Sequence, residues 1–126
     1  GADGVILSSH GGRQLDYAVA PLRALEQIRP AMPDFPIMID GGIRRGSDVI
    51  KAMALGANAV FVGRPFLYAA TVGQAEAVRH ATHLLKEEVD RDMALLGLNT
   101  LSELSADHLV AARHRQNTTI GEQGNG

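Results

Sequence analysis

The feature that most constrains the fold is a pattern that occurs three times along the chain: a short apolar run, a loop with glycine and arginine, and a helical segment. The apolar runs are residues 5–7, 37–39 and 59–62. Short runs of this kind, bounded by glycine and polar residues, are typical of strands buried on both faces of a sheet. Strands that alternate with helices indicate a parallel sheet, so we predict an α/β fold.

Prolines, glycines and polar caps place the first two helices. The first is predicted to begin at Pro21, since proline suits the first helical position, and to end near Arg29. Ser47 is predicted to be the N-cap of the second helix, and Gly56 its C-terminal stop. The apolar residues at helical spacing are Leu22, Leu25 and Ile28 in the first helix and Val49, Ile50, Met53 and Ala54 in the second.

The part of the chain after the third apolar run is predicted to be mostly helical. We expect a short turn of helix over 66–70 and the longest helix over 74–96, where apolar residues recur every three or four positions. Thr100 or Ser102, and then Ser105, are predicted to cap short terminal helices.

Two histidines on the predicted long helix, His80 and His83, lie three residues apart and could both contact a metal ion. The sequence places no carboxylate or third imidazole to complete such a site. We therefore interpret them as a solvated pair and predict no metal site.

Composition excludes several classes of protein. A chain of 126 residues, 45% of them hydrophobic, can bury one modest core. Its net charge of -2 gives no positive excess to attract nucleic acid, and without cysteine it has no disulfide framework. No apolar run approaches the roughly 20 residues of a membrane span. We expect a chain that begins in the middle of a fold, one folded unit over 1–112 and a polar tail over 113–126.

The stretch after the first apolar run, residues 8–16, combines a base, two glycines and a cation. His10 is expected just past the carboxyl end of a strand, where parallel α/β sheets bind their ligands. Histidine titrates near neutral pH and can act as a general base, and the Arg13 guanidinium matches a carboxylate bidentately. Together they suit proton abstraction next to an acid group. Taken singly, each residue also fits a solvated loop or a simple turn.

The second and third apolar runs also end in glycine and arginine, at residues 40–44 and 63–64. Glycines between a strand and a helix leave backbone N–H groups free to hold an anion. Because the carboxyl ends of parallel strands meet at one edge, an anionic ligand such as a phosphate can span both loops. The alternative is that these glycines only make tight connections.

The chain closely resembles the carboxyl-terminal portion of the FMN-dependent α-hydroxy-acid oxidase and dehydrogenase family in two motifs, SSHGGRQLD at 8–16 and DGGIRRGSDVIKAMALGANAVFVGRPFLY at 40–68. That family includes glycolate oxidase, L-lactate dehydrogenase and mandelate dehydrogenase. The resemblance extends over residues 1–110 and its combined motifs are highly specific. It implies that the chain is the last three β/α units of a TIM (β/α)8 barrel, which as a whole needs about 250 residues.

The resemblance also implies roles for particular residues. His10 matches the family's active-site base, Arg13 the arginine that binds the substrate carboxylate, and Ser8 a flavin-contacting serine. The residues that match the segments around the FMN ribityl chain and phosphate are Asp40, Gly41, Gly42, Ile43 and Arg44, with Gly63 and Arg64 in the second phosphate loop. The chain departs from the family at Ser9, where the family usually has asparagine, so we expect different local hydrogen bonding there.

The activity implied is FMN-dependent oxidation of an L-2-hydroxy acid, of the lactate, mandelate or glycolate type, to the 2-keto acid. His10 would take a proton either from the α-carbon, leaving a carbanion, or from the hydroxyl while a hydride passes to the flavin; Arg13 would orient the carboxylate. Electrons would then pass to oxygen, a quinone or a cytochrome. The family also implies a homo-oligomer, commonly a tetramer, in the cytoplasm or peripherally attached at the inner face of a membrane.

Several functional residues of the family have no counterpart in this chain: a lysine near the flavin ring, tyrosines that contact the substrate and an aspartate that pairs with the histidine. We therefore expect the chain alone to be inactive. Three alternatives remain. An inosine-monophosphate dehydrogenase-like barrel shares the phosphate loop but lacks SHGGRQLD and uses a catalytic cysteine. The others are a phosphate-binding barrel without flavin and a truncated half-barrel that serves only in assembly.

Overall fold

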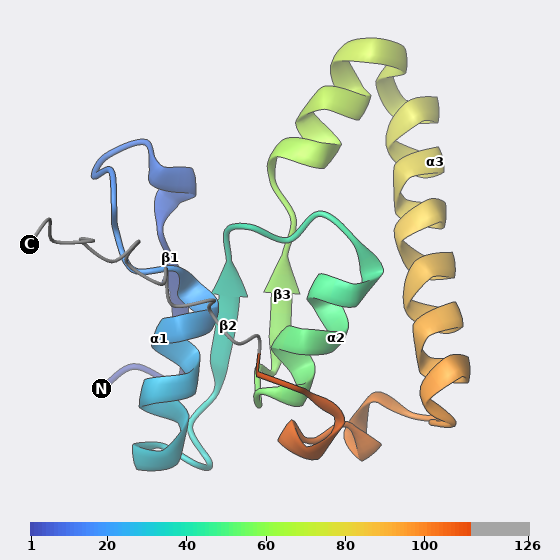
Figure 1. Ribbon diagram of the computed structural model, residues 1–126. Coiled ribbons are helices and arrows are strands. Elements are labelled where there is room, and N and C mark those ends of the chain that lie inside the picture. Colours follow the sequence, from blue (N-terminus) through green and yellow to red (C-terminus); the bar gives the residue numbers. More distant parts are fainter. Residues whose placement is uncertain (112–126) are drawn as a thin grey trace, which may run out of the picture.

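The computed structural model describes residues 1–111 and contains the predicted parallel sheet. Its strands are β1 (Val5–Ser8), β2 (Ile37–Asp40) and β3 (Ala59–Phe61), which lie in that order (Figure 1). The register places Ser8 beside Asp40 and Asp40 beside Phe61. All three strands therefore end at the same edge of the sheet.

Helices follow each of the strands. They are α1 (Pro21–Ile28), α2 (Gly46–Ala54) and α3 (Arg64–Leu96), with short 3₁₀ helices at His10–Gly12, Arg29–Ala31, Leu101–Glu103 and Ala106–His108. α1 packs against β1 and β2, whereas α2 packs against β3 and α3. The predicted first helix is confirmed, because α1 begins at Pro21 and passes into a 3₁₀ turn at Arg29.

α3 consists of two helical arms joined by a sharp bend. Gly73 and Gln74 leave helical geometry, with Gln74 at a φ of 52°. Figure 1 shows the first arm leading away from β3 and the second returning beside α2. A glycine at such a break is a common cause of a helix kink. The two predicted helical segments are confirmed, although the first begins at Arg64, earlier than expected.

The N-cap predicted for α2 is wrong. Arg45 occupies the N-cap position and Ser47 lies exposed inside the helix. The reason is that a residue one position later takes over the capping: the Asp48 carboxylate accepts hydrogen bonds from the backbone N–H groups of Arg44 at 3.0 Å and Arg45 at 3.1 Å. The predicted stop is confirmed, since Gly56 follows the helix with a φ of 93°.

The core lies between α1, α2 and the central strand. Leu25 of α1 and Ile37 and Ile39 of β2 are fully buried. Burying an aliphatic side chain of this size contributes about 1.5–3 kcal/mol. Val49 and Ala52 of α2 belong to the same cluster, together with Ile43 and Ala57. The buried face of α2 was correctly predicted in part, because Val49, Ile50 and Ala54 are buried whereas Met53 is only partly buried.

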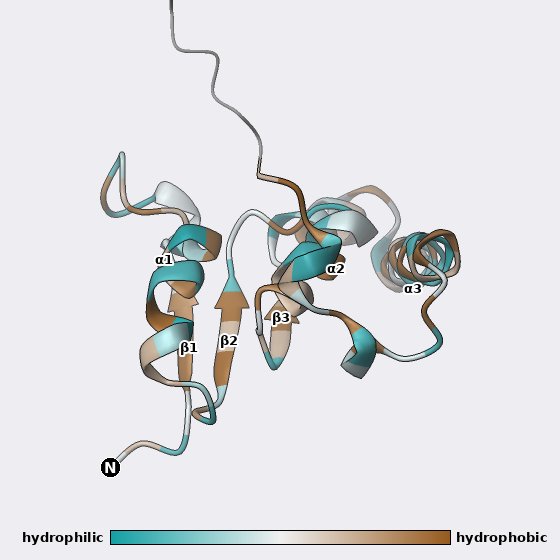
Figure 2. Cartoon of the chain, turned by 60° about the horizontal axis from the view of Figure 1, so that its bottom comes forward, coloured by the Kyte–Doolittle hydropathy of each residue, from teal (hydrophilic) through white to brown (hydrophobic). Residues whose placement is uncertain are grey.

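β1 is less buried than its sequence predicted. Its Val5 and Ile6 are 37% and 48% exposed, although β2 is buried as expected. The reason is that β1 lies at the margin of the described sheet, where it has one neighbouring strand, whereas β2 has two. Figure 2 shows β1 as a largely apolar strand at this margin.

At the opposite edge from the strand ends, Arg29 fastens the loop that leads into β2. Its Nη1 donates to the carbonyl oxygens of Met32 at 2.8 Å, Pro33 at 3.0 Å and Phe35 at 2.9 Å. Its Nη2 donates to Asn58 Oδ1 at 3.1 Å. One guanidinium therefore provides hydrogen-bond donors for several carbonyl groups of a proline-rich loop. These carbonyl groups have no partners in a helix or a sheet.

The end of the described chain forms two capped 3₁₀ turns. Thr100 and Ser105 are the N-caps, as predicted. Hydrogen bonding from the Thr100 side chain lowers the pKa of Glu103 below its ordinary value. The predicted tail over 113–126 and its boundary lie outside the described residues. Among residues 1–111, no helix is both long and apolar enough to cross a membrane.

Candidate functional site

The ends of β1 and β2 are joined by a short chain of hydrogen bonds. Ser8 Oγ donates to Asp40 Oδ2 at 2.6 Å, and the backbone N–H of His10 donates to Ser8 Oγ at 3.0 Å. Ser8 and Asp40 are register partners, which explains why their side chains meet. The hydroxyl of Ser8 thus connects the base-bearing loop to the carboxylate of the neighbouring strand.

The loop after β1 turns sharply at His10. The residues His10, Gly11 and Gly12 have φ values of 51°, 64° and 72°, all in the left-handed region. Glycine adopts this conformation freely, whereas for histidine it costs roughly 1–3 kcal/mol. The turn is closed by hydrogen bonds from Gly12 N to Ser9 O at 2.9 Å and from Arg13 N to His10 O at 3.2 Å. Two glycines therefore let the chain reverse immediately after His10.

A cavity of about 500 Å³ lies at this edge of the sheet. Every residue predicted to belong to the site lines it, except Ser8: His10, Arg13, Asp40, Gly41, Gly42, Ile43, Arg44, Gly63 and Arg64. Ser8 is connected to it through its hydrogen bond to Asp40. The loops after all three strands therefore meet in one place, as expected from the strand register.

Sequence reasoning missed most of the apolar residues of this cavity. Phe61, Leu67 and Tyr68 also line it, and they are 46%, 63% and 65% exposed. The only signal for them was their position at the end of β3 and in the first turns of α3, beside the second glycine and arginine loop. Such residues provide a surface on which a planar ring can pack.

The charge of the cavity favours an anion. Its lining contains the three arginines Arg13, Arg44 and Arg64, but a single carboxylate, Asp40. The guanidinium of Arg64 lies close to the first loop, with Nη2 only 3.4 Å from the place that a Cβ on Gly11 would occupy. Guanidinium groups bind phosphates and carboxylates in planar, bidentate geometry.

Backbone geometry provides a second set of anion-binding groups. Gly41 and Gly42 have φ values of 112° and 83°, which only glycine adopts readily. Room beside Gly41 is limited, because a Cβ there would lie 3.1 Å from Ser9 Oγ. α3 begins at the cavity with Gly63 as its N-cap, so its positive dipole end faces this edge. Ser9 thus packs against the glycine loop.

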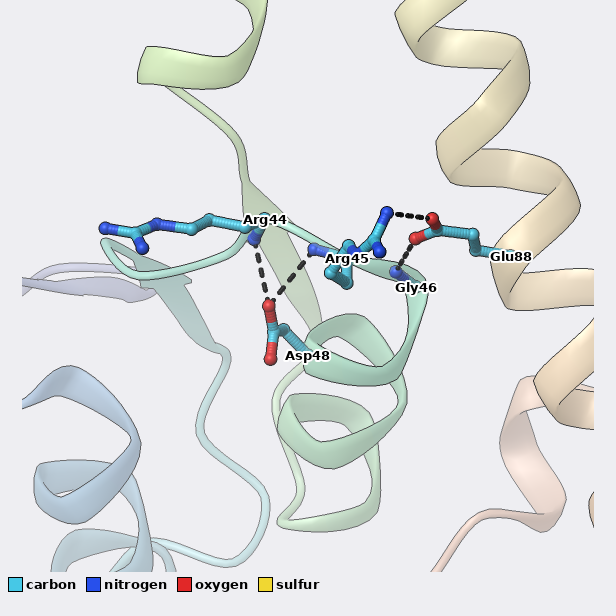
Figure 3. Close-up of polar contacts among 5 residues, drawn as sticks. All are labelled: Arg44, Arg45, Gly46, Asp48 and Glu88. Atoms are coloured by element: carbon cyan, nitrogen blue, oxygen red, sulfur yellow. Dashed lines mark hydrogen bonds and ion pairs between the residues drawn. The ribbon is translucent and has the colours of Figure 1, made fainter.

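The N-terminus of α2 is already occupied by carboxylates. Asp48 binds the N–H groups of Arg44 and Arg45, and Glu88 of α3 binds the N–H of Gly46 at 2.8 Å (Figure 3). The backbone N–H of Arg44 is therefore engaged by Asp48, while its side chain points away from α3 (Figure 3) and the residue lines the cavity. By contrast, α3 has no acidic residue in its first turn, and its N-cap Gly63 lines the cavity.

The described residues offer no cluster for a metal ion. No group of three or more His, Cys, Asp or Glu side chains is close enough to hold one within residues 1–111. His83 instead contacts Glu87 of the same helix, with 3.2 Å between Nε2 and Oε1.

Known proteins share both the sequence and the fold of this chain. Residues 1–111 match the FMN-dependent dehydrogenase family. The chain is 44% identical to glycolate oxidase 3 of Oryza sativa subsp. indica over 116 residues, which cover 91% of this chain and 32% of that protein. It is 46% identical to L-lactate dehydrogenase (cytochrome) of Wickerhamomyces anomalus over 115 residues, covering 86% and 20% respectively.

Solved structures give the same result. A soluble mutant of the membrane-associated (S)-mandelate dehydrogenase from Pseudomonas putida is 48% identical, with a TM-score of 0.81 over 85% of this chain and 30% of that chain. A flavocytochrome b2 variant with sulfite bound is 43% identical, with a TM-score of 0.82 over 85% and 29%. The chain thus spans about a third of the glycolate oxidase it matches. Since the family match covers the entire described part, the chain belongs to the FMN-dependent dehydrogenase family.

Proposed function

We propose that this chain supplies part of the active site for FMN-dependent oxidation of an L-2-hydroxy acid to the 2-keto acid, as the last three β/α units of a TIM barrel. The observation that carries the proposal is the single cavity that brings His10 and Arg13 together with Arg44 and Arg64. A base, a carboxylate-binding cation and an anion-binding edge are the groups that this reaction needs in one place.

The residues present fit FMN. Left-handed glycines Gly41 and Gly42 let the backbone approach a phosphate closely, and the guanidinium groups of Arg44 and Arg64 match its charge. Asp40, held by Ser8, is an acceptor suited to ribityl hydroxyls. When bound, FMN supplies the acceptor for the two electrons of the oxidation.

The chain's own residues would then act on the substrate. His10 takes a proton, either from the α-carbon or from the hydroxyl, and Arg13 holds the carboxylate so that the reacting atom faces the base. Only the neutral form of a histidine side chain can accept this proton. The hydrogen bond from His10 N–H to Ser8 fixes the backbone that carries this imidazole.

The finer features of the activity remain predictions. Relatives are named as glycolate oxidase and as L-lactate dehydrogenase (cytochrome). We propose a small L-2-hydroxy acid of the glycolate, lactate or mandelate type as substrate, and oxygen, a quinone or a cytochrome as electron acceptor. A homo-oligomer and a cytoplasmic location, free or at the inner face of a membrane, are proposed with them.

A chimera tests the proposal. Residues 1–111 replace the matching segment of the soluble (S)-mandelate dehydrogenase, to which the chain is 48% identical. We expect a protein that purifies with FMN and whose flavin absorbance bleaches when mandelate, lactate or glycolate is added without oxygen. The unaltered host is the control. A folded chimera without flavin, or with flavin that none of these acids reduces, would refute the proposed function.

A further inference from the structure

One side chain outside the cavity reaches from α3 to the loop that leads into α2. Glu88 lies in the second arm of α3, and its Oε2 accepts the backbone N–H of Gly46 at 2.8 Å. Its Oε1 accepts a hydrogen bond from Nη1 of Arg45, also at 2.8 Å (Figure 3). The Glu88 side chain is 26% exposed, so water shields these bonds only in part. A carboxylate at the start of a helix is also favoured by the helix dipole.

The backbones of α2 and α3 touch at the same point. A Cβ on Gly46 would lie 2.5 Å from Glu88 Cβ and 2.6 Å from the backbone carbonyl carbon of Glu88 and the nitrogen of Val89. No side chain fits there. Glycine at this position therefore lets the second arm of α3 approach closely enough for Glu88 to reach the N-terminus of α2.

The side chains of two adjacent arginines point in opposite directions at this contact. The side chain of Arg45 is directed toward α3, where Glu88 holds it, whereas Arg44 points the other way and lines the cavity (Figure 3). Asp48 binds the backbone N–H groups of both arginines from within α2. The loop that carries Arg44 is thus fastened at its end by two carboxylates from two different helices.

We propose that Glu88 is a positioning residue for the phosphate of FMN. By accepting the backbone N–H of Gly46, it fixes the loop 41–45 in the shape that presents the Arg44 side chain and the glycine N–H groups to the phosphate. Glu88 does not line the cavity, so it acts through the loop and not on the ligand. This inference rests on the proposed function and names one residue that supports it from outside the site.

The test measures flavin affinity in the chimera. Its apoprotein is titrated with FMN and with riboflavin, which lacks the phosphate, and binding is followed by flavin fluorescence. We expect Glu88→Ala to weaken FMN binding by about tenfold, by analogy with the loss seen when a residue that orients a metal ligand is removed. Riboflavin affinity stays unchanged, because only the phosphate loop is disturbed.

Two further variants sharpen the comparison. Glu88→Gln keeps an oxygen for the N–H of Gly46 but loses the charge, so its FMN affinity falls between those of the parent and Glu88→Ala. If Glu88→Ala fails to fold, the FMN and riboflavin affinities of Glu88→Gln test the positioning role of Glu88. Glu87→Gln, one residue earlier and paired with His83 on the helix surface, is the matched control and leaves both affinities unchanged.

Equal losses of FMN and riboflavin affinity would overturn the proposal, since a purely structural role affects both ligands. Unchanged FMN affinity in both Glu88 variants would overturn it as well, while leaving the proposed function intact. A folded parent chimera that binds no FMN would instead refute the proposed function, and this inference with it. The two failures are therefore distinguishable.

Discussion

At the scale of single residues, hydrogen bonds hold neighbouring side chains of the site in different positions. The backbone N–H of His10 donates to the hydroxyl of Ser8, and that hydroxyl donates to Asp40. Arg44 and Arg45 are adjacent in the sequence, yet one lines the cavity and the other is bound by Glu88. Spacing alone does not distinguish such neighbours; their hydrogen-bond partners do.

The two arginines provide a matched pair of substitutions. In the chimera, we predict that Arg44→Gln weakens FMN binding about tenfold or more, because hydrogen bonds to charged groups are worth about 1.5–3 kcal/mol. Arg45→Gln changes FMN affinity little, since its ion pair with Glu88 leaves its side chain 74% exposed and such pairs contribute about 0–1 kcal/mol. Flavin fluorescence titration measures both; equal effects of the two substitutions would contradict the assignment of Arg44 to the phosphate.

Arg29 is a second residue whose geometry carries a prediction. Its guanidinium donates to three carbonyl oxygens and to Asn58, which an ammonium group on a single atom cannot reproduce. We predict that Arg29→Lys lowers the free energy of unfolding by about 1.5–3 kcal/mol. Arg23→Lys, at an exposed position of α1, stays within about 0.5 kcal/mol. Urea unfolding of the two chimera variants decides, and equal stabilities would disprove the role of Arg29.

At the scale of elements, the contact between α2 and α3 is set by the absence of a side chain at Gly46. We predict that Gly46→Ala costs at least about 1–3 kcal/mol of stability, because the added Cβ meets backbone atoms that cannot move aside separately. Ser47→Ala is the control, since Ser47 is exposed and is not the N-cap. Thermal unfolding of both variants checks this, and a Gly46→Ala variant as stable as the control would show that α2 and α3 can separate freely.

The elements themselves could largely be predicted from the sequence. Short apolar runs and helical spacing depend on local residues, and they located β1, β2 and α1 correctly. Local patterns failed where a distant or competing group decides the outcome. Ser47 is a good cap by type, but Asp48 took that function. β1 looks like a buried strand, but burial depends on what lies beside it, which no local pattern reports.

The residues that line the cavity could be predicted from the sequence, but the residue that holds their loop from outside could not. Residues at the ends of parallel strands converge by geometry, so a pattern of glycines and arginines after each strand was enough to identify the cavity. Glu88 could not be found in this way. It lies 43 residues from Arg45 in sequence, on a helix whose charged residues look like an ordinary solvated face. Only the folding of α3 back onto α2 brings it to the loop.

At the scale of the whole molecule, the chain covers only part of the length of the proteins that it matches. It spans 32% of the glycolate oxidase and 30% of the mandelate dehydrogenase that it matches. From the resemblance to the family, we expect its flavin-ring lysine and substrate tyrosines to lie on earlier strands, without a counterpart in this chain. The exposed apolar residues of β1 and the open cavity fit a surface that further barrel strands would cover.

We therefore predict that the chain of 126 residues does not oxidise 2-hydroxy acids by itself. The missing groups would contact the flavin ring and the substrate, so without them neither is held in a reactive geometry. The measurement is an assay of the purified chain with FMN and lactate, mandelate or glycolate, with the chimera as positive control. Turnover by the isolated chain would disprove this prediction.

The central claim is that His10 is the base of a flavin-dependent oxidation. Rapid mixing of the FMN-loaded chimera with its hydroxy acid, in the absence of oxygen, measures flavin reduction directly, and flavin absorbance before mixing reports how much FMN is bound. We predict that His10→Ala keeps its FMN, because His10 is not one of the phosphate-binding groups, and loses flavin reduction. A His10→Ala variant that reduces its flavin as fast as the parent would contradict the claim.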